Sequence, residues 1–302
     1  MADTPRIGVI GLPGKWSSEA LADAVQARTG ERLLFDMTDV RLDLADNSLW
    51  HGDQNLCELD ALIVKKISAE YSPHTLDRLE LLRAAESAGV RVFSPALSIL
   101  RLIDRLSCTV TLRNAGIPMP ETRVTGNTAD AEKAVRDFGE AVFKPLYSTK
   151  ARGMCVLGTD LPGAELQARI EEFRSNNPVL YIQRQLVLPG HDLGLVFLGG
   201  RYLGCYARVG SKGTWNTTIH SGGRYRAFDA PDSMIELAER AQGLFELDFT
   251  TVDIAETADG PVVFEVSAFG GFRGAKEGIG IDAAALYCDY VIESLATDRS
   301  GA

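Results

Sequence analysis

The run from Thr250 to Gly271, TTVDIAETADGPVVFEVSAFGG, limits what this chain can fold into more than any other segment. Two β-branched stretches flank Ala258-Asp259-Gly260, and Asp-Gly between such stretches is typical of a β-hairpin. If the turn is centred on Asp259, residues equally far from it along the chain face each other. The pairs predicted by this register are Val252 with Val266, Ile254 with Phe264, and Asp253 with Glu265. One face of the hairpin is therefore apolar, and the other carries two carboxylates.

The opposed carboxylates of Asp253 and Glu265 need a compensating charge. Side chains that face each other across two strands have Cβ atoms about 5 Å apart, and like charges there are destabilising. A shared proton or a bound cation relieves the repulsion, and Mg²⁺ is the natural ion because it takes one or two carboxylates together with substrate phosphates. Ser267, two residues beyond Glu265 on the same face, adds a further oxygen. The alternative is a surface hairpin with solvated carboxylates, and a one-residue slip of the turn would separate the pair.

The composition excludes some partners and leaves the fold open. The 302 residues are 45% apolar and 24% charged, which is ordinary for a soluble globular protein of one or two domains or three small subdomains. The net charge of −10 disfavours nucleic acid and anionic membranes as partners. The five cysteines are scattered, and the chain shows neither a signal peptide nor an apolar run of about 18 residues. We therefore expect a cytoplasmic protein with reduced thiols.

Strands and helices alternate over residues 1–95. The strand predicted over Arg6–Gly11 leads through a Gly-rich turn into a helix from about Ser17, whose N-terminus could accept an anion. The turn matches neither the GxxxxGK[ST] nor the GxGxxG phosphate-binding motif. Such alternation predicts a parallel sheet, with any ligand at the carboxyl ends of the strands. The further elements expected here are strands over 32–35, 61–64 and 91–93 and a helix over 73–88.

The rest of the chain continues as a mixture of helices and strands, many of them bounded by Gly or Pro. The helices expected are 95–115, 128–138, 231–245 and 281–295. The strands expected are 122–125, 141–145, 179–188, 193–198, 201–209 and the two of the hairpin.

Lys144 lies near the end of the strand over 141–145, and the loop after it is rich in hydroxyls and cations. Its residues are Leu146-Tyr147-Ser148-Thr149-Lys150-Ala151-Arg152-Gly153. This composition between two strands suits a mobile cover over phosphates, with Lys144 below it. A solvated hairpin tip explains the composition equally well.

A second loop, Gly210–Gly223, has the sequence GSKGTWNTTIHSGG. Its four glycines alternate with polar residues that include Lys212, Asn216 and His220, and such a loop supplies hydrogen-bond donors to an anion. The four histidines of the chain show no ligand spacing, so a structural role is favoured for His220.

Taken together, these segments resemble the ATP-grasp superfamily, and within it the RimK-like α-L-glutamate ligases, from about Val90 to Ala285. The segments that carry the resemblance are, in order, RVFSPALSILRLIDRLSCTVTLRNAGIPMPET, VFKPL with its loop, YIQRQL, PGHDLGLVFLGGRYLGCYARV, WNTTIHSGG, TTVDIAETADGPVVFEVSAFGG and GIGIDAA. Each is weak alone, but the order and spacing are specific. The resemblance implies an α/β fold with an N-terminal Rossmann-like domain (1–95), a linker helix and lid subdomain (96–185), and a C-terminal catalytic subdomain (186–302).

The resemblance also assigns roles to residues, with ATP held between the lid and the C-terminal subdomain and Mg²⁺, or Mn²⁺ in its place, as the ion. The ATP-binding positions would be Arg105, Lys144, Ser148, Lys150, Arg152, Gly153, Gln183, Arg184, Gln185, Leu186, Asp192 and Arg208. Among them Lys144 matches a lysine on the α-phosphate, 183–186 the hinge that meets adenine, and Asp192 an acid on the ribose. The metal positions would be Asp253, Glu265 and Ser267, and the catalytic positions Arg208, Lys212 and Asn216.

The chemistry that the resemblance implies is amide formation between a carboxylate and an amine, with ATP converted to ADP. The carboxylate attacks the γ-phosphoryl group to give an acyl phosphate, while magnesium and cations neutralise the transferring oxygens. A closed lid keeps water from this intermediate, and the amine then displaces phosphate. Residues 1–95 would help to hold the acceptor.

Several positions depart from the family pattern. Glu265-Val266-Ser267 stands where the family has Glu-x-Asn, and Asp192-Leu193-Gly194 stands where it has acid-Ile-Arg. An arginine and an asparagine of the family are replaced by Asn216 and Thr218, and the lid loop is poor in glycine. These changes weaken the assignment of glutamate as the substrate. The cations left to supply positive charge instead are Lys150, Arg152 and Lys212.

Three functions fit this sequence. We favour a ligase, in a homodimer or homotetramer, that adds glutamate or a similar amino acid to a small-molecule acceptor such as a folate-like or other one-carbon carrier. A small acceptor is favoured by the net negative charge and by the absence of an extended basic or apolar patch. The second is a RimK-like modifier of a protein or peptide C-terminus. The third, suggested by Ser267, Asn216 and Gly194, is an ATP-binding module without ligase chemistry.

Overall fold

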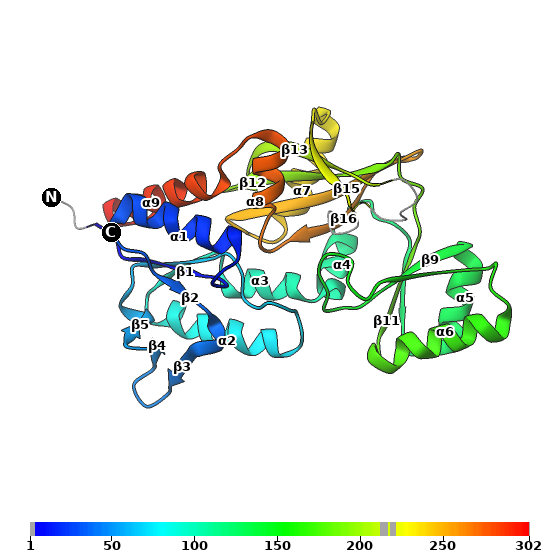
Figure 1. The fold of residues 1–302 in the computed structure, drawn as a ribbon, viewed down its shortest axis with the longest axis horizontal. Coiled ribbons are helices and arrows are strands. Elements are labelled where there is room, and N and C mark those ends of the chain that lie inside the picture. Colours follow the sequence, from blue (N-terminus) through cyan, green and yellow to red (C-terminus); the bar gives the residue numbers. More distant parts are fainter. Residues whose placement is uncertain (1–3, 212–216, 218–221, 302) are drawn as a thin grey trace.

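The computed structural model describes residues 4–211, 217 and 222–301, with side chains as far as residue 298, and Figure 1 shows the fold. It contains the α/β architecture expected from the sequence, built on three main sheets and one small one. Within the part of the chain that the structure describes, every helix is too short or too polar to span a bilayer.

The N-terminal sheet is parallel, with strand order β2-β1-β6-β7. Its strands are β1 (Ile7–Ile10), β2 (Leu34–Phe35), β6 (Ala61–Val64) and β7 (Arg91–Phe93), and its helices are α1 (Trp16–Thr29) and α2 (His74–Ser87). The chain leaves β1 on one side to form β2 and returns on the other side to form β6. The carboxyl ends of β1 and β6 therefore enclose a topological switch point, where open α/β sheets bind ligands.

A small antiparallel sheet between β2 and β6 was not predicted. It consists of β3 (Val40–Asp43), β4 (Ser48–His51) and β5 (Gln54–Asn55), bordered by the 3₁₀ turns η1 (Met37–Asp39) and η2 (Leu56–Glu58). These strands have two to four residues each, and β3 is only partly buried, so their hydrophobic pattern is too short to read.

The prediction of a single long helix over 95–115 is wrong. The segment forms α3 (Ala96–Ile103) and α4 (Arg105–Asn114), separated at Asp104, whose φ of −91° and ψ of 119° are extended. The Asp104 side chain accepts a hydrogen bond from Leu106 N at 2.9 Å, so it caps a new helix instead of continuing the old one. Arg105 thereby becomes the first residue of α4.

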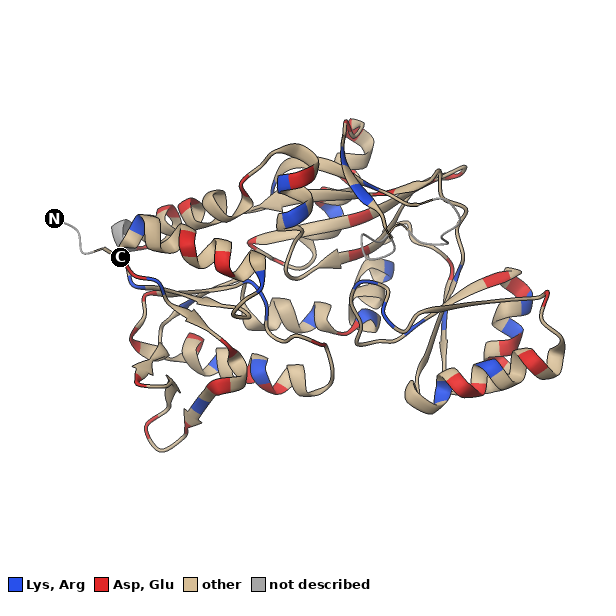
Figure 2. Ribbon diagram, in the orientation of Figure 1, with Lys and Arg blue, Asp and Glu red and all other residues tan. Residues whose placement is uncertain are grey.

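The lid has its own sheet and its own core. Its antiparallel strands, in the order β10-β9-β11-β8, are β8 (Thr122–Thr125), β9 (Glu140–Lys144), β10 (Cys155–Gly158) and β11 (Leu180–Arg184), and its helices are α5 (Thr128–Phe138) and α6 (Gly163–Asn176). Most of its buried hydrophobic residues form a cluster of their own between Ala131 and Ile182. The outer faces of α5 and α6 carry interspersed acidic and basic residues (Figure 2). The strand predicted over 179–188 is shorter than expected, because its pairing with β8 and β9 ends at Arg184.

The C-terminal sheet is antiparallel, in the order β14-β13-β12-β15-β16. Its strands are β12 (His191–Leu198), β13 (Arg201–Val209), β14 (Arg224–Phe228), β15 (Phe249–Thr257) and β16 (Gly260–Ser267), and its helices are α7 (Asp232–Gly243), α8 (Phe272–Ile279) and α9 (Ala283–Gly301). Strand β14 was not predicted. Residues of α7 join one hydrophobic cluster and those of α8 and α9 another, and both clusters include residues of the N-terminal sheet. The N-terminal and C-terminal parts therefore share their cores, whereas the lid does not.

Helix α9 ties the end of the chain to its beginning, since it packs along α1 (Figure 1). Arg28 Nη2 donates to Asp289 Oδ2 at 2.9 Å, and Arg91 pairs with Asp298. The predicted divisions at residues 95 and 185 stay a prediction, and the third of these units would include a helix that packs on the first.

The hairpin β15-β16 forms as predicted in its functional part and differs near the turn. Asp253 faces Glu265 and Val252 faces Val266, which confirms two of the predicted pairs. The pair of Ile254 with Phe264 is wrong, because a β-bulge sets Ile254 opposite Val263 and leaves Phe264 as the extra residue. Phe264 therefore does not lie on the apolar face, and it lines a cavity together with Glu265.

Gly194, one of the departures from the family pattern, is explained by the packing of Tyr206. The two residues face each other across β12 and β13, and a Cβ atom on Gly194 would lie 2.5 Å from Tyr206 Cζ. The Tyr206 ring is buried and also covers Gly271, Gly274 and Gly278, so it has no room to move. A side chain at position 194 is therefore incompatible with this ring.

We predict that Gly194→Ala lowers the free energy of unfolding by about 1–3 kcal/mol, because overpacking forces buried neighbours off their rotamers. Urea denaturation of the purified protein measures this change. Gly243→Ala is the matched control, since no atom lies within 4 Å of the added Cβ, and its stability should equal or slightly exceed that of the wild type. Equal stability of the two variants would contradict the packing explanation.

Candidate functional site

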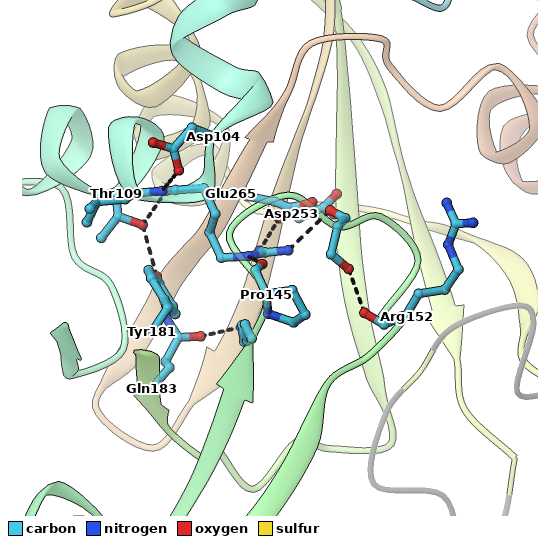
Figure 3. A network of polar contacts seen from close by, with 12 residues as sticks. Asp104, Thr109, Pro145, Arg152, Tyr181, Gln183, Asp253 and Glu265 are labelled. Carbon is cyan, nitrogen blue, oxygen red and sulfur yellow. Dashed lines mark hydrogen bonds and ion pairs between the residues drawn. The ribbon is translucent and has the colours of Figure 1, made fainter. Parts of the chain in front are cut away.

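The opposed carboxylates of the hairpin are neutralised by two arginines, and the first is Arg105. As the leading residue of α4, it reaches Glu265 with Nη1 to Oε2 at 2.7 Å, and its side chain is only 9% exposed. Its Nε also donates to Pro145 O at 3.4 Å, and its backbone N–H to Leu146 O at 3.2 Å. Figure 3 shows these contacts around Glu265 and Pro145. Arg105 therefore links strand β16 to the start of the lid loop.

The second is Arg208 on β13, which bridges two carboxylates. Its Nη2 lies 2.9 Å from Asp253 Oδ2, and its Nε lies 3.1 Å from both carboxylate oxygens of Asp192. Thr217 Oγ1 also donates to Asp192 Oδ1 at 2.6 Å. Burial alone lowers the pKa of Arg208, but the two carboxylates outweigh it and hold that pKa well above its ordinary value. Burial also raises the pKa of Asp253, and Arg208 opposes that shift.

Lys144 is a buried cation at the end of β9. Its Nζ donates to Gln183 Oε1 at 2.5 Å and lies 5.3 Å from the centroid of the Phe264 ring. Burial, with a smaller contribution from Arg105, lowers the pKa of Lys144 to about 7. Among the described residues no carboxylate forms an ion pair with it. A buried ammonium without an acidic partner suits an anionic ligand.

Hydrogen bonds within the lid loop hold its conformation. Ser148 Oγ donates to Arg152 O at 2.7 Å, and Arg152 Nη2 donates to Thr149 Oγ1 at 3.0 Å. Lys150 and Gly153 adopt left-handed backbone conformations, with φ of 61° and 69°. Arg152 also crosses to the N-terminal domain, where its Nη1 lies 3.0 Å from Glu70 Oε1. The predicted cover is thus an ordered loop that contacts the N-terminal domain.

The predicted adenine hinge combines a fully bonded Gln183 side chain with two side chains that each keep one polar atom without a partner. The amide of Gln183 is buried and donates to Thr122 Oγ1 at 3.0 Å, and Tyr181 Oη continues this network to Thr109 Oγ1 at 2.9 Å (Figure 3). In contrast, Arg184 Nε and Gln185 Oε1 are buried without a hydrogen-bond partner. A buried donor and a buried acceptor without partners are groups that a ligand could satisfy, and the contact of this hinge with adenine stays a prediction.

The metal positions offer oxygen ligands only. Asp253 and Glu265 are carboxylates, and the Ser267 hydroxyl is the third predicted ligand. The described residues contain no cluster of three or more His, Cys, Asp or Glu side chains suited to a metal. A donor set of two carboxylates and a hydroxyl fits Mg²⁺, which completes its shell with water and substrate phosphates.

A cavity of about 60 Å³ opens beside Glu265. Residues of the N-terminal domain, the lid loop and the hairpin line it together, among them Tyr71, Arg105, Ser148, Thr149, Glu265 and Ser267. The space enclosed next to the predicted metal ligands is therefore formed by all three parts of the chain.

The structure thus brings the cations Arg105, Lys144 and Arg208 together with both hairpin carboxylates. Asp192, predicted to bind ribose, is instead occupied by Arg208 and Thr217 here, and a ribose contact stays a prediction. Lys212, Asn216 and His220 lie outside the described residues. Lys65, Lys66 and Tyr71 were not predicted as site residues, although two lysines directly after a buried parallel strand were a readable signal.

Comparison with known proteins agrees with this geometry. A family model described as the RimK-like ATP-grasp domain matches residues 103–291. A tetrahydromethanopterin:α-L-glutamate ligase of Methanosarcina acetivorans is 26% identical over 269 residues, which cover 84% of this chain and 83% of that protein. A probable α-L-glutamate ligase of Cellvibrio japonicus is 24% identical, covering 95% of each chain.

Solved structures share the fold. The ATP-grasp ligase PsnB with a minimal precursor superposes with a TM-score of 0.74 at 21% identity, covering 97% of this chain and 99% of that one. The RimK domain ATP-grasp protein of Sphaerobacter thermophilus gives 0.74 at 23% identity, covering 94% and 98%. With the family model matching more than half of its length, this chain belongs to the RimK-like ATP-grasp family and is an ATP-grasp ligase.

Proposed function

We propose that this protein is an ATP- and magnesium-dependent ligase that joins glutamate to a carboxylate of a small one-carbon-carrier cofactor. The observation that carries the proposal is the arrangement of three cations, Arg105, Lys144 and Arg208, around the opposed carboxylates Asp253 and Glu265. Fixed positive charge of this kind stabilises a transferring phosphoryl group. The names of the relatives, glutamate ligases and in one case a tetrahydromethanopterin:α-L-glutamate ligase, support glutamate and a reduced pterin.

Each part of the site has a role in this proposal. The hinge with Arg184 and Gln185 holds adenine, and Lys144 holds a phosphate close to β9. Magnesium, when bound by Asp253, Glu265 and Ser267, would supply further neutralisation of the phosphate oxygens. Arg105 and Arg208 neutralise the hairpin carboxylates and are placed to meet negative charge that develops during transfer.

The lid supplies the exclusion of water. It packs around its own core, so it can move without disturbing the cores that the other two parts share. The loop with Ser148 and Arg152 closes against the N-terminal domain through Glu70. Closure protects an acyl phosphate from hydrolysis until the amine of glutamate attacks it.

The direct test incubates the protein with ATP, magnesium, L-glutamate and tetrahydromethanopterin, followed by mass spectrometry. We expect ADP and an acceptor heavier by one or more glutamyl residues. A mass gain on a protein or peptide, with none on the pterin, would instead favour modification of a polypeptide tail. Nucleotide binding without ADP from any acceptor in a metabolite extract would favour a binding module.

The metal positions are tested by Asp253→Asn and Glu265→Gln, which should each lower ADP formation about 100-fold or more, the scale of a lost electrostatic contact in a transition state. A stopped-time or steady-state assay of the rate of ADP formation measures this loss. Because Arg105 and Arg208 already neutralise the carboxylates, relief of repulsion should not stabilise either variant, and Glu265→Gln should cost about 1–3 kcal/mol, since it leaves the nearly buried guanidinium of Arg105 without its carboxylate. The control is Asp259→Asn, at the exposed tip of the same hairpin, which should keep full activity.

Lys144 predicts a pH dependence of nucleotide binding. Its pKa of about 7 in the free protein should rise in the complex, because phosphate stabilises the ammonium. Below pH 7 Lys144 is already charged in the free protein. Above pH 7 it is mostly neutral there, so nucleotide binding must be accompanied by the uptake of a proton. MgADP affinity measured by calorimetry should therefore fall between pH 7.5 and 9, by at most about tenfold per pH unit. Lys144→Ala should lose about 1–3 kcal/mol of binding and this pH dependence; an identical slope in the variant would reject the assignment.

A further inference from the structure

The switch point of the N-terminal sheet opens towards the candidate site and carries two lysines. Lys65 and Lys66 follow β6 directly, and their backbone N–H groups donate to Ile10 O of β1 at 2.8 and 3.2 Å. They therefore lie between the carboxyl ends of the two strands at which the sheet changes direction. This is the position where open α/β sheets bind ligands.

Lys65 is engaged by the protein itself. It is buried, its Nζ donates to the carbonyl oxygens of Phe269 and Gly270, and it lies 4.0 Å from the centroid of the Phe272 ring. These contacts fix the segment that follows the metal strand β16. Lys65 is thus a positioning residue with little capacity for a ligand.

Lys66 is different, because its partners leave its charge uncompensated. Its Nζ donates to Tyr71 Oη at 3.0 Å and lies 4.3 and 5.3 Å from the ring centroids of Tyr71 and Phe269. The ammonium has three donors, and no carboxylate pairs with it among the described residues. Burial, together with smaller contributions from the cations Lys150 and Arg152 of the lid loop, lowers the pKa of Lys66 to about 8.

Tyr71 connects Lys66 to the predicted reaction centre. It lines the cavity that Glu265 and Ser148 also line. Burial is the larger cause of the raised pKa of Tyr71, and the negative charge of Glu265 is the second cause. Next to it, Glu70 holds Arg152 of the lid loop. One tyrosine side chain therefore separates the ammonium of Lys66 from the space beside the metal ligands.

The phosphate groups of the nucleotide already have cations of their own. Lys144, Arg105 and Arg208 approach the hairpin from the lid, α4 and β13, whereas Lys66 approaches from the N-terminal sheet. The positive charge of Arg152 is balanced by Glu70. Lys66 and Lys150 have no acidic partner in the part of the chain that the structure describes. A half-buried cation of this kind is stabilised by an anion that arrives with the substrate.

We propose that Lys66, oriented by Tyr71, binds a substrate carboxylate other than the one that is phosphorylated, and so makes the enzyme selective for a carboxylate-rich substrate. The inference rests on the proposed function. The carboxylate belongs either to the incoming amino acid, as the side chain of glutamate, or to the acceptor. The ammonium and the phenol hydroxyl together provide the charge-assisted hydrogen bonds that a carboxylate accepts.

The test compares Lys66→Met and Lys66→Arg with the wild type in the same assay of glutamate, tetrahydromethanopterin and MgATP. We expect Lys66→Met to raise the KM of one carboxylate substrate at least tenfold, with kcat reduced much less and the Kd of MgADP changed less than twofold. Lys66→Arg should recover most of the loss. If the contact is with glutamate, the preference for L-glutamate over L-glutamine should collapse in Lys66→Met; if it is with the acceptor, only the pterin KM should rise.

Lys133→Met is the matched control, because Lys133 is an exposed lysine on α5 of the lid. It should leave every constant unchanged. The inference on Lys66 would be overturned if Lys66→Met kept the substrate KM values of the wild type. It would also be overturned if the Kd of MgADP weakened by the same factor as a substrate KM. A wild type that neither binds these two probes in calorimetry nor forms ADP would overturn the proposed function as well, so the two failures are distinct.

Discussion

The neutralisation of two facing carboxylates by two arginines is the interaction on which the site depends. Asp253 and Glu265 are brought together by the hairpin register, and without compensation the pair would be destabilising. Arg105 pairs with Glu265 and Arg208 with Asp253, each from a different structural element. Both guanidinium groups are held largely away from water, where charge interactions are strong. The groups that neutralise the hairpin are thus the same ones that we propose for phosphate chemistry.

The arrangement of the cores determines which parts can move. The N-terminal and C-terminal sheets are joined through two shared hydrophobic clusters, and α9 adds ion pairs between the two ends of the chain. The lid has a separate cluster, and its contacts with the remainder include the hydrogen bond of Arg105 to Pro145 O, the hydrogen bond between Tyr181 and Thr109, and the pair of Arg152 with Glu70. A body with a continuous core and a cover with its own core fits the closing lid that we propose for this ligase.

The departures from the family pattern have different physical meanings. Gly194 stands where the resemblance led us to expect an arginine, and the buried ring of Tyr206 occupies the space that a side chain there would need. Ser267 stands where we expected an asparagine, and it keeps a hydroxyl oxygen in the lining of the cavity. In the residues that the structure describes, neither change disturbs the pairing of Arg105 and Arg208 with the hairpin. The departures therefore alter the surroundings of the site more than its charged centre.

The sequence by itself determined the elements and the chemistry that depend on local pattern. Alternating strands and helices, the Asp-Gly turn, the facing carboxylates and the motif order were readable because each arises within a short stretch or from a fixed succession of stretches. Tertiary structure alone decided the break at Asp104, the bulge at Phe264, the pairing of Arg105 with Glu265 and the place of Lys66. Arg105 and Glu265 are 160 residues apart, and no periodicity reports a contact made by packing between distant segments.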